Sequence, residues 1–186
     1  MNVAMDLQPT LTGTHIVLRP LHESDRDALY AVASDPLLWA LHPAHDRHEP
    51  EVFRAFFDDA LASGGALVAI DPKTGAIIGS SRYDFGRAEP GEIEVGWTFL
   101  ARACWGGAVN SKMKRLMLAY AFNWVDAVIF LVGESNLRSR RALEKIGARL
   151  TTRTQRAVMA GGEVVHVIYA MSRADFTQSP LMDDRA

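Results

Sequence analysis

The sequence has very little cysteine and no long hydrophobic run. Cys104 is the only cysteine among 186 residues, so the chain has no internal disulfide and no zinc site made of four cysteines. A lone cysteine fits a reducing compartment, and we expect a cytoplasmic protein. Charged residues interrupt the apolar runs well before the roughly 18 residues that a membrane helix needs. The first ten residues lack a basic stretch leading into an apolar one, so we expect no targeting segment and no membrane partner.

An excess of charge of one sign is missing as well. The 20 Lys and Arg residues nearly balance the 22 Asp and Glu residues, and the formal net charge is -2. This balance provides no global basic field for nucleic acid, and it disfavours a nucleic-acid-binding module. The sequence also lacks G-x-x-x-x-G-K-[ST] and a G-x-G-x-x-G that opens a βαβ unit, so ATP and NAD are disfavoured as ligands.

The composition that remains is that of one folded domain. Apolar residues make up 48% and charged residues 23% of the chain, which is ordinary for a globular protein. The length suits a single domain over residues 1–186, with a core at about 11–176. The polar tail, residues 177–186, is expected to fray.

Hydrophobic periodicity and turn residues predict the order β-α-α-β-β-β-α-β-α-β-β. The helices are expected from Ser24 to about Ser34, from Pro50 to Ser63, from about Ser111 to Trp124, and from Asn136 to Gly147. The strands are expected at residues 14–18, 66–70, 76–81, 92–100 and 127–132, and on both sides of the turn at 160–162. Gly96 lies inside the strand at 92–100, where a glycine commonly marks a bulge or a close ligand approach. This order predicts an α/β (α+β) fold: a mixed, mostly antiparallel sheet of about seven strands with helices on both faces.

The segment 101–110 links a predicted strand to a predicted helix and contains Gly106 and Gly107. Small residues let the backbone approach a ligand closely, and the free N–H groups of a first helical turn can hold a diphosphate. The alternative is that the two glycines only make a turn. Basic residues crowd the starts of two helices, where they oppose the helix dipole unless an anion is near. They either converge on one polyphosphate or are solvated surface charges: Lys112, Lys114, Arg115, Arg138, Arg140 and Arg141.

Three segments together resemble the signatures of one family. They are residues 94–100 (EVGWTFL), 105–110 (WGGAVN) and 136–148 (NLRSRRALEKIGA). They look like successive motifs of the GNAT acetyltransferases, most closely the branch of the ribosomal-protein N-terminal acetyltransferases. The similarity runs from about Leu11 to Phe176. It implies a GNAT-like fold and an N-acetyltransferase that moves acetyl from acetyl-CoA to a primary amine within a ternary complex.

The resemblance also implies a coenzyme site. Backbone amides of one loop would bind the pyrophosphate of coenzyme A, through Trp105, Gly106, Gly107, Ala108, Val109 and Asn110. Phe99 and Leu100 would pair with the pantetheine arm, while Asn136 would reach the coenzyme or the thioester and Arg141 is assigned to the coenzyme. The family usually has Gln or Arg in place of Cys104 and Gly or Ala in place of Val109. These departures leave open a non-catalytic acyl-CoA binder or sensor.

Acetyl transfer needs a neutral amine and a proton for the departing thiolate. By resemblance Glu94 is the general base, with Glu92 two residues away on the same face as its substitute; the alternative is a solvent-facing carboxylate. Ser139 is the family-like proton donor, although it could instead support the start of its helix. Tyr169 or Tyr83 could serve in its place, or be packed aromatic residues.

His42, His45 and His48 lie beside Asp46 in a loop bracketed by prolines. A metal site is conceivable there, but without a cysteine ligand the imidazoles are expected to be surface or substrate-facing groups, and no metal is expected. Cys104 has no recognisable His and Asn partners, so it is expected to be a bystander thiol.

By position in the fold, Trp39, His42 and His45 would shape the acceptor site, and Tyr83 is assigned to acceptor binding as well. The acceptor could be a protein N-terminus, an amino acid, a polyamine or an aminoglycoside. The oligomeric state stays open, with a homodimer among the alternatives.

Overall fold

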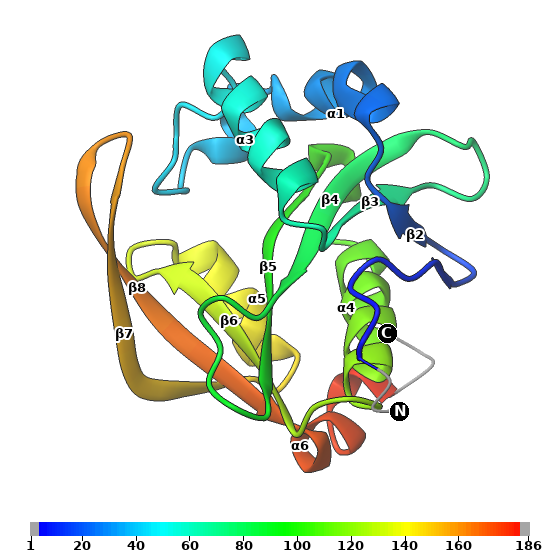
Figure 1. The fold of residues 1–186 in the computed structure, drawn as a ribbon, viewed down its shortest axis with the longest axis vertical. Coiled ribbons are helices and arrows are strands. Elements are labelled where there is room, and N and C mark those ends of the chain that lie inside the picture. Colours follow the sequence, from blue (N-terminus) through cyan, green and yellow to red (C-terminus); the bar gives the residue numbers. More distant parts are fainter. Residues whose placement is uncertain (1–3, 183–186) are drawn as a thin grey trace.

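The computed structural model describes residues 4–182 and contains one eight-stranded sheet in the order β1-β2-β3-β4-β5-β6-β8-β7 (Figure 1). All neighbouring strands are antiparallel except β5 and β6. The strands are β1 Leu11–Thr12, β2 Val17–Pro20, β3 Ala66–Ile70, β4 Ile77–Asp84, β5 Glu92–Leu100, β6 Ala127–Gly133, β7 Arg149–Met159 and β8 Gly162–Ser172. The predicted mixed, mostly antiparallel sheet is confirmed. The eighth strand is the two-residue β1, and the strand expected at residues 14–18 lies instead at β2.

The helices match the four that the sequence predicts and add shorter ones. They are α1 Arg26–Ala33, α2 Pro36–Trp39, α3 Pro50–Ala62, α4 Val109–Ala121, α5 Leu137–Lys145 and α6 Arg173–Thr177, with 3-10 turns η1 Glu23–Asp25, η2 Arg102–Cys104 and η3 Pro180–Met182. The sequence analysis missed α2, which begins where the Asp35 carboxylate accepts a hydrogen bond from the Leu37 amide at 3.0 Å. No helix within residues 4–182 is long and apolar enough to cross a membrane.

The sheet separates two hydrophobic cores, one on each face. On one face α1 and α3 pack against β3 and β5 through residues that include Leu29, Phe57 and Phe99. On the other face α4 and α5 pack against β5, β6 and β8 through residues that include Met117 and Leu143. Figure 1 shows α1 and α3 together at the top of the molecule and α4 beside the lower half of the sheet. The expectation of helices on both faces is confirmed.

The end of the chain is more ordered than its polar composition suggests. Ser179 is 6% exposed and Leu181 is 4% exposed, since η3 packs its apolar side chain into the core beside α4. The expectation of a frayed tail from residue 177 is therefore wrong as far as Met182. Residues 183–186 lie outside the described part of the chain.

Strands β5 and β6 are paired only at their beginnings. The parallel register joins Glu92 to Ala127 and ends where Glu94 faces Ile129. On its other edge β5 has a bulge against β4, between the pairs Arg82 with Gly96 and Ser80 with Phe99. Trp97 has a φ of 51°, in the left-handed region that a bulky side chain rarely adopts. The bulge expected near Gly96 is confirmed, and beyond Glu94 the two strands diverge.

Tyr83 is part of the core under α4. Its side chain has no exposed surface, and its hydroxyl donates a hydrogen bond to the Met117 carbonyl at 2.7 Å. Burial raises the pKa of this phenol well above its usual range. The residue therefore ties β4 to α4.

We expect Tyr83→Phe to lower the free energy of unfolding by about 1 kcal/mol, because a typical intramolecular hydrogen bond contributes about that much. Urea unfolding followed by circular dichroism measures the change. Tyr120→Phe is the matched control, since the Tyr120 hydroxyl donates to the Asp6 carbonyl at an exposed position. An equal loss of unfolding free energy in both variants would show that the buried hydrogen bond stabilises the fold no more than the exposed one.

Candidate active site

Two connected pockets lie where β5 and β6 diverge. The loop pocket is bordered by residues 104–106 and the start of α5, and the strand pocket lies between β5 and β6. They share six lining residues and so form one cleft: His42, Thr98, Asn110, Asn136, Ser139 and Ala142. Because α4 follows β5 and α5 follows β6, both helices begin at the open end of this cleft.

The loop before α4 exposes its backbone to the loop pocket. Gly106 has a φ of 73°, and a Cβ added at Gly106 or Gly107 would meet nothing within 4 Å. The N-cap of α4 is Ala108, whose side chain cannot accept a hydrogen bond from the first turn. The Trp105 indole fixes the loop by donating to the Leu100 carbonyl at 3.0 Å. Uncapped amides at the start of a 13-residue helix fit an anion such as a diphosphate.

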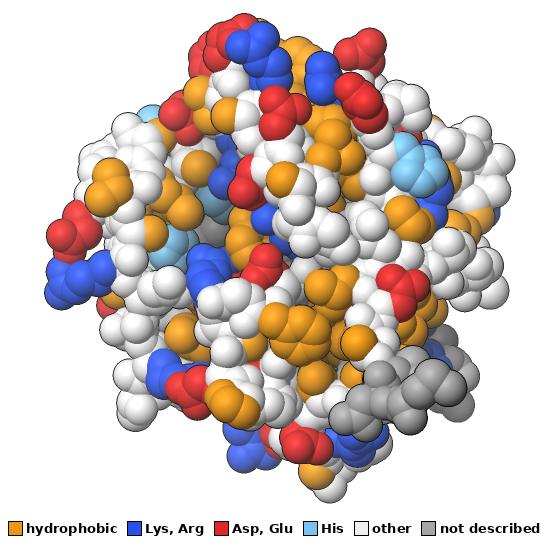
Figure 2. Space-filling model, viewed as in Figure 1, with side chains coloured by type: hydrophobic (Ala, Val, Ile, Leu, Met, Phe, Trp, Pro, Cys, Tyr) orange, Lys and Arg blue, Asp and Glu red, His pale blue; other side chains and the backbone are white. Residues whose placement is uncertain are grey.

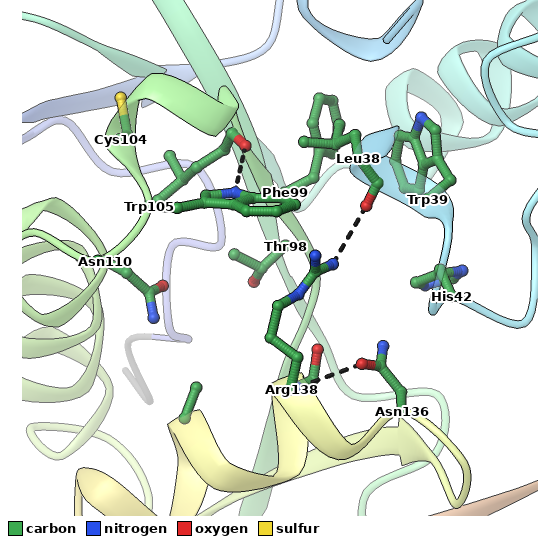
Figure 3. A pocket seen from close by; sticks show the side chains of 14 residues that line it. Leu38, Trp39, His42, Thr98, Phe99, Cys104, Trp105, Asn110, Asn136 and Arg138 are labelled. Carbon is green, nitrogen blue, oxygen red and sulfur yellow. Dashed lines mark hydrogen bonds between the residues drawn. The ribbon is translucent and has the colours of Figure 1, made fainter. Parts of the chain in front are cut away.

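The start of α5 forms the opposite wall (Figure 3). The Asn136 side chain, 2% exposed, accepts a hydrogen bond from the Ser139 amide at 3.2 Å and caps the helix. Arg138 extends from α5 across the pocket. Its guanidinium donates to the Leu38 carbonyl at 3.2 Å and lies 4.0 Å from the centre of the Trp105 ring. The two walls of the loop pocket are thus joined through a cation.

The segment between α1 and α3 supplies a third wall. Trp39 is 2% exposed and donates through its indole nitrogen to the Ala33 carbonyl at 2.7 Å. His42 lies edge-on to Trp39, and its Nδ1 accepts a hydrogen bond from the Ala44 amide at 2.9 Å. Burial, and then the charge of Arg47, lower the pKa of His42 to about 3. The ring is therefore neutral, and its remaining proton is on Nε2.

The structure places Glu94 behind the cleft and not on its wall. The carboxylate is 1% exposed and is held by Arg87 through two hydrogen bonds of 2.9 and 2.6 Å. Burial raises the pKa of Glu94, and the charge and hydrogen bonds of Arg87 oppose that rise. Its substitute Glu92 is held in the same way by Arg153, with bonds of 3.0 and 2.9 Å.

Lys114, expected only as one of six basic residues at the helix starts, is a buried residue of the site. It is 5% exposed, lines the strand pocket, and donates from Nζ to Thr98 Oγ1 at 2.9 Å. Its Nζ also lies 5.4 Å from the centre of the Phe130 ring. Among residues 4–182 no carboxylate forms an ion pair with it, and burial lowers its pKa to about 7. A buried, unpaired lysine in a pocket is a candidate functional group.

A sequence signal for Lys114 existed. The buried face of α4 consists of Met113, Lys114, Met117, Leu118 and Ala121. The expected apolar stripe shares Met113, Met117 and Ala121 with this face but continues through Leu116, Tyr120 and Trp124 instead of Lys114 and Leu118. Counting Leu118 as a core residue would have placed Lys114, four residues earlier, on the inner face.

Several predicted site residues line the cleft. Trp39, Phe99, Leu100, Trp105 and Gly106 line the loop pocket, and His42, Asn110, Asn136 and Ser139 line both pockets. Gly107, Ala108 and Val109 continue the loop beside these residues without lining either pocket.

Other candidates are placed elsewhere. Tyr83 is buried in the core, so its assignment to acceptor binding is contradicted by its position. Tyr169 is also buried, and its hydroxyl donates to the Glu144 carboxylate at 2.6 Å. Arg141 is exposed and lines neither pocket, and His45 is exposed next to the β7–β8 turn. Of the six basic residues at the helix starts, Lys114 and Arg138 line the cleft.

Cys104 lines the loop pocket, and burial raises the pKa of its thiol. A thiol with a raised pKa is a poor nucleophile at neutral pH, in agreement with a bystander role. Within residues 4–182 no group of three or more His, Cys, Asp or Glu side chains could hold a metal ion.

Comparison with known proteins identifies the family of this site. A family profile described as an acetyltransferase (GNAT) domain matches residues 15–149. A GCN5-related N-acetyltransferase from Brucella melitensis has a TM-score of 0.75 at 21% identity, over 91% of this chain and 81% of that one. Mycobacterium smegmatis RimJ, in complex with CoA-disulfide, has a TM-score of 0.71 at 16% identity, over 94% and 92% of the two chains.

The Vibrio fischeri ribosomal-protein-S5-alanine acetyltransferase has a TM-score of 0.66 at 15% identity, over 90% of this chain and 98% of that one. No match was found among the curated proteins. The similar structures share the fold, and the profile covers most of the chain, including the β5 strand, the loop before α4 and the α5 helix. The chain therefore belongs to the GNAT acetyltransferases, a family of acyl-transferring enzymes.

Proposed function

We propose that this protein transfers acetyl from acetyl-CoA directly to a primary amine, of a protein N-terminus or a small molecule, within a ternary complex. The observation that carries the proposal is the uncapped, glycine-containing start of α4, which opens into the cleft between the diverging strands. The structurally similar M. smegmatis RimJ was solved in complex with CoA-disulfide, which supports the same ligand here. The single cysteine supports a cytoplasmic location.

Different residues along the cleft bind different parts of acetyl-CoA. Amides of residues 105–110 hold the pyrophosphate, and the free edge of β5 at Phe99 and Leu100 accompanies the pantetheine arm. Asn136 orients the thioester end from the start of α5. Acetyl-CoA supplies a thioester, whose acyl carbon forms a bond with the amine nitrogen while its bond to sulfur breaks. The electron pair of that bond leaves with the sulfur.

Two protons must then move. Glu94 accepts the proton of the incoming ammonium group through a water molecule, because its carboxylate lies behind the pocket wall. Lys114 donates a proton to the thiolate from the floor of the strand pocket. Its Nζ is oriented by Thr98, whose Oγ1 also lies 2.8 Å from Ser81 Oγ. Ser139 stays a second candidate for this donor, whereas Tyr83 and Tyr169 bind other partners.

The proposal is tested by calorimetry with coenzyme A and by thiol release from acetyl-CoA in the presence of amines. Gly106→Val should weaken coenzyme A binding about tenfold, since a side chain there would strain the loop and crowd its amides. Gly75→Val is the matched control, because Gly75 has a similar φ of 74° in a remote open turn. Absence of binding to the wild-type protein would refute the proposal. Binding without turnover of any amine would leave a non-catalytic acyl-CoA sensor.

The pH dependence tests Glu94 as the base. Arg87 lowers the pKa of Glu94, so Arg87→Met should raise it further. A base works only when deprotonated, and the acid limb of the kcat/KM profile should therefore move to higher pH, with a larger loss at pH 6 than at pH 8.5. Arg153→Met is the control, because Arg153 holds Glu92 in the same way. If the acid limb moves in Arg153→Met and not in Arg87→Met, the base is Glu92.

Removal of the Lys114 ammonium group should lower kcat. We expect Lys114→Met to reduce kcat about a hundredfold, in the range of general acid catalysis, with a smaller effect on KM for acetyl-CoA. A donor with a pKa of about 7 is active when protonated, so the wild-type rate should fall above about pH 7 and the variant should lose this alkaline limb. Lys112→Met should behave as wild type. Unchanged kcat and pH profile in Lys114→Met would assign the proton to Ser139 or to solvent.

A further inference from the structure

The walls of the cleft carry charge of one sign. Among the described residues that line the two pockets there are two cations, Lys114 and Arg138, two histidines, His42 and His166, and no aspartate or glutamate. A polyamine or another polycation would find no carboxylate partner on these walls. The charge of the site thus bears on which amines can enter it.

More cations stand directly behind the aromatic walls. The guanidinium groups of Arg82 and Arg87 lie 4.3 and 4.5 Å from the centre of the Trp97 ring, which lines the strand pocket. Arg47 lies 5.1 Å from the ring of Trp39, which lines the loop pocket. Figure 2 shows a hollow left of the centre, near the β7–β8 hairpin, with histidine and Lys or Arg side chains in its wall and acidic side chains at its right-hand rim.

The neighbouring carboxylates satisfy Arg87 but only part of Arg82. Glu94 is used by Arg87, and Asp59, whose side chain is 66% exposed, bonds only Nη1 of Arg82 at 2.9 Å. Nε and Nη2 of Arg82 are buried without a hydrogen-bond partner in the described chain. Asp46 and Asp84 add negative charge nearby but form no ion pair with the three arginines among residues 4–182.

Arg47 and His166 are incompletely partnered as well. The Arg47 guanidinium lies 4.3 Å from the centre of the Phe56 ring. Phe56 is one helical turn from Asp59, the partner of Arg82, so both arginines contact the same face of α3. It has no ion pair within residues 4–182. His166, 6% exposed, lines the strand pocket with a buried and unpartnered Nδ1. Burial lowers the pKa of Arg47 to about 10, so its cation persists at neutral pH.

The coenzyme does not account for this group of cations. Its phosphates are assigned to the loop before α4, which packs in the core on one face of the sheet. Arg47 lies against Trp39 and Phe56, which belong to the core on the other face. Arg47 and Arg82 line neither pocket but lie against α3, on the face of the sheet opposite α4, and the acceptor is proposed to enter from this side.

We propose that the acceptor amine carries an anionic oxygen group, a carboxylate or a phosphate, that binds at the Arg47 and Arg82 side of the cleft. This inference rests on the proposed acetyl transfer and narrows its substrate class. An anion close to the amine offsets the repulsion that the cationic site exerts on an ammonium group. The positive charge of the surrounding arginine and lysine side chains lowers the pKa of the bound amine and favours its neutral, nucleophilic form.

The test compares acceptors that differ only in the anionic group. Amino acids are paired with their amides, dipeptides with an acidic second residue with their Gln or Asn counterparts, and O-phosphoethanolamine with ethanolamine. Spermidine and an aminoglycoside serve as polycations. The amides are weaker bases with more neutral amine at pH 8, so without anion recognition they would react faster. We expect the anionic member of at least one pair to have a kcat/KM about a hundredfold higher.

Arg47→Met tests the site itself, since methionine keeps the apolar contact with Trp39 and Phe56. The variant should lose about tenfold or more of the preference for the anionic acceptor while its affinity for coenzyme A stays unchanged. Arg82→Gln provides a second variant, used if its melting temperature matches wild type. Arg54→Gln is the control, because the Arg54 side chain is 59% exposed on α3 and pairs only with Glu51 among residues 4–182.

The outcomes separate the two proposals. Acetylation of the anionic acceptors with loss of preference in Arg47→Met supports the inference, and the preferred pair identifies the source of the anion. Acetylation of amides, amines or spermidine as fast as the anionic acceptors overturns it while leaving acetyl transfer intact. If no amine is acetylated in any arm, the proposed function falls and the inference falls with it.

Discussion

The short parallel pairing of β5 with β6 is the constraint on which the rest of the site depends. The ladder ends at Glu94 and Ile129, and beyond this point β5 stays paired with β4 while β6 stays paired with β8. The sheet therefore opens between two strands whose following helices both begin at the opening. Backbone amides at the start of α4 and the capped start of α5 face each other across the gap.

The opening also explains why charged groups are buried here. Lys114 and Glu94 are 5% and 1% exposed, and each sits next to the gap, where a ligand or water can replace the solvation that burial removes. Burial disfavours the charged form of both groups, so it raises the pKa of Glu94 and lowers the pKa of Lys114. A base with a raised pKa and an acid with a lowered pKa both favour the proton transfers that acyl transfer to an amine requires. A closed sheet would have excluded both residues from its interior.

Much of this architecture could be predicted from the sequence because its signals are local. The cap at Asn136, the stop at Ser63 and the bulge near Gly96 follow from short-range backbone chemistry, and each is present. Other features depend on which side chains face each other across strands and helices. Examples are the buried position of Tyr83 and the two hydrogen bonds that Arg87 donates to Glu94. Such contacts leave no periodic signal, so a buried tyrosine was mistaken for a binding residue.

The charge of the cleft is another property that local sequence signals do not predict. A net charge of -2 describes the whole chain and says nothing about the sign of the charge at one site. Arg47 and Arg87 come from two loops, Arg82 from a strand and Lys114 from a helix, and only the fold gathers them around one opening. Among residues 4–182 no acidic side chain lines the two pockets, and Glu94, which is buried behind the cleft, is paired with Arg87. A nearly neutral chain thus builds a locally cationic site, in which an ammonium group is disfavoured and a neutral amine is not.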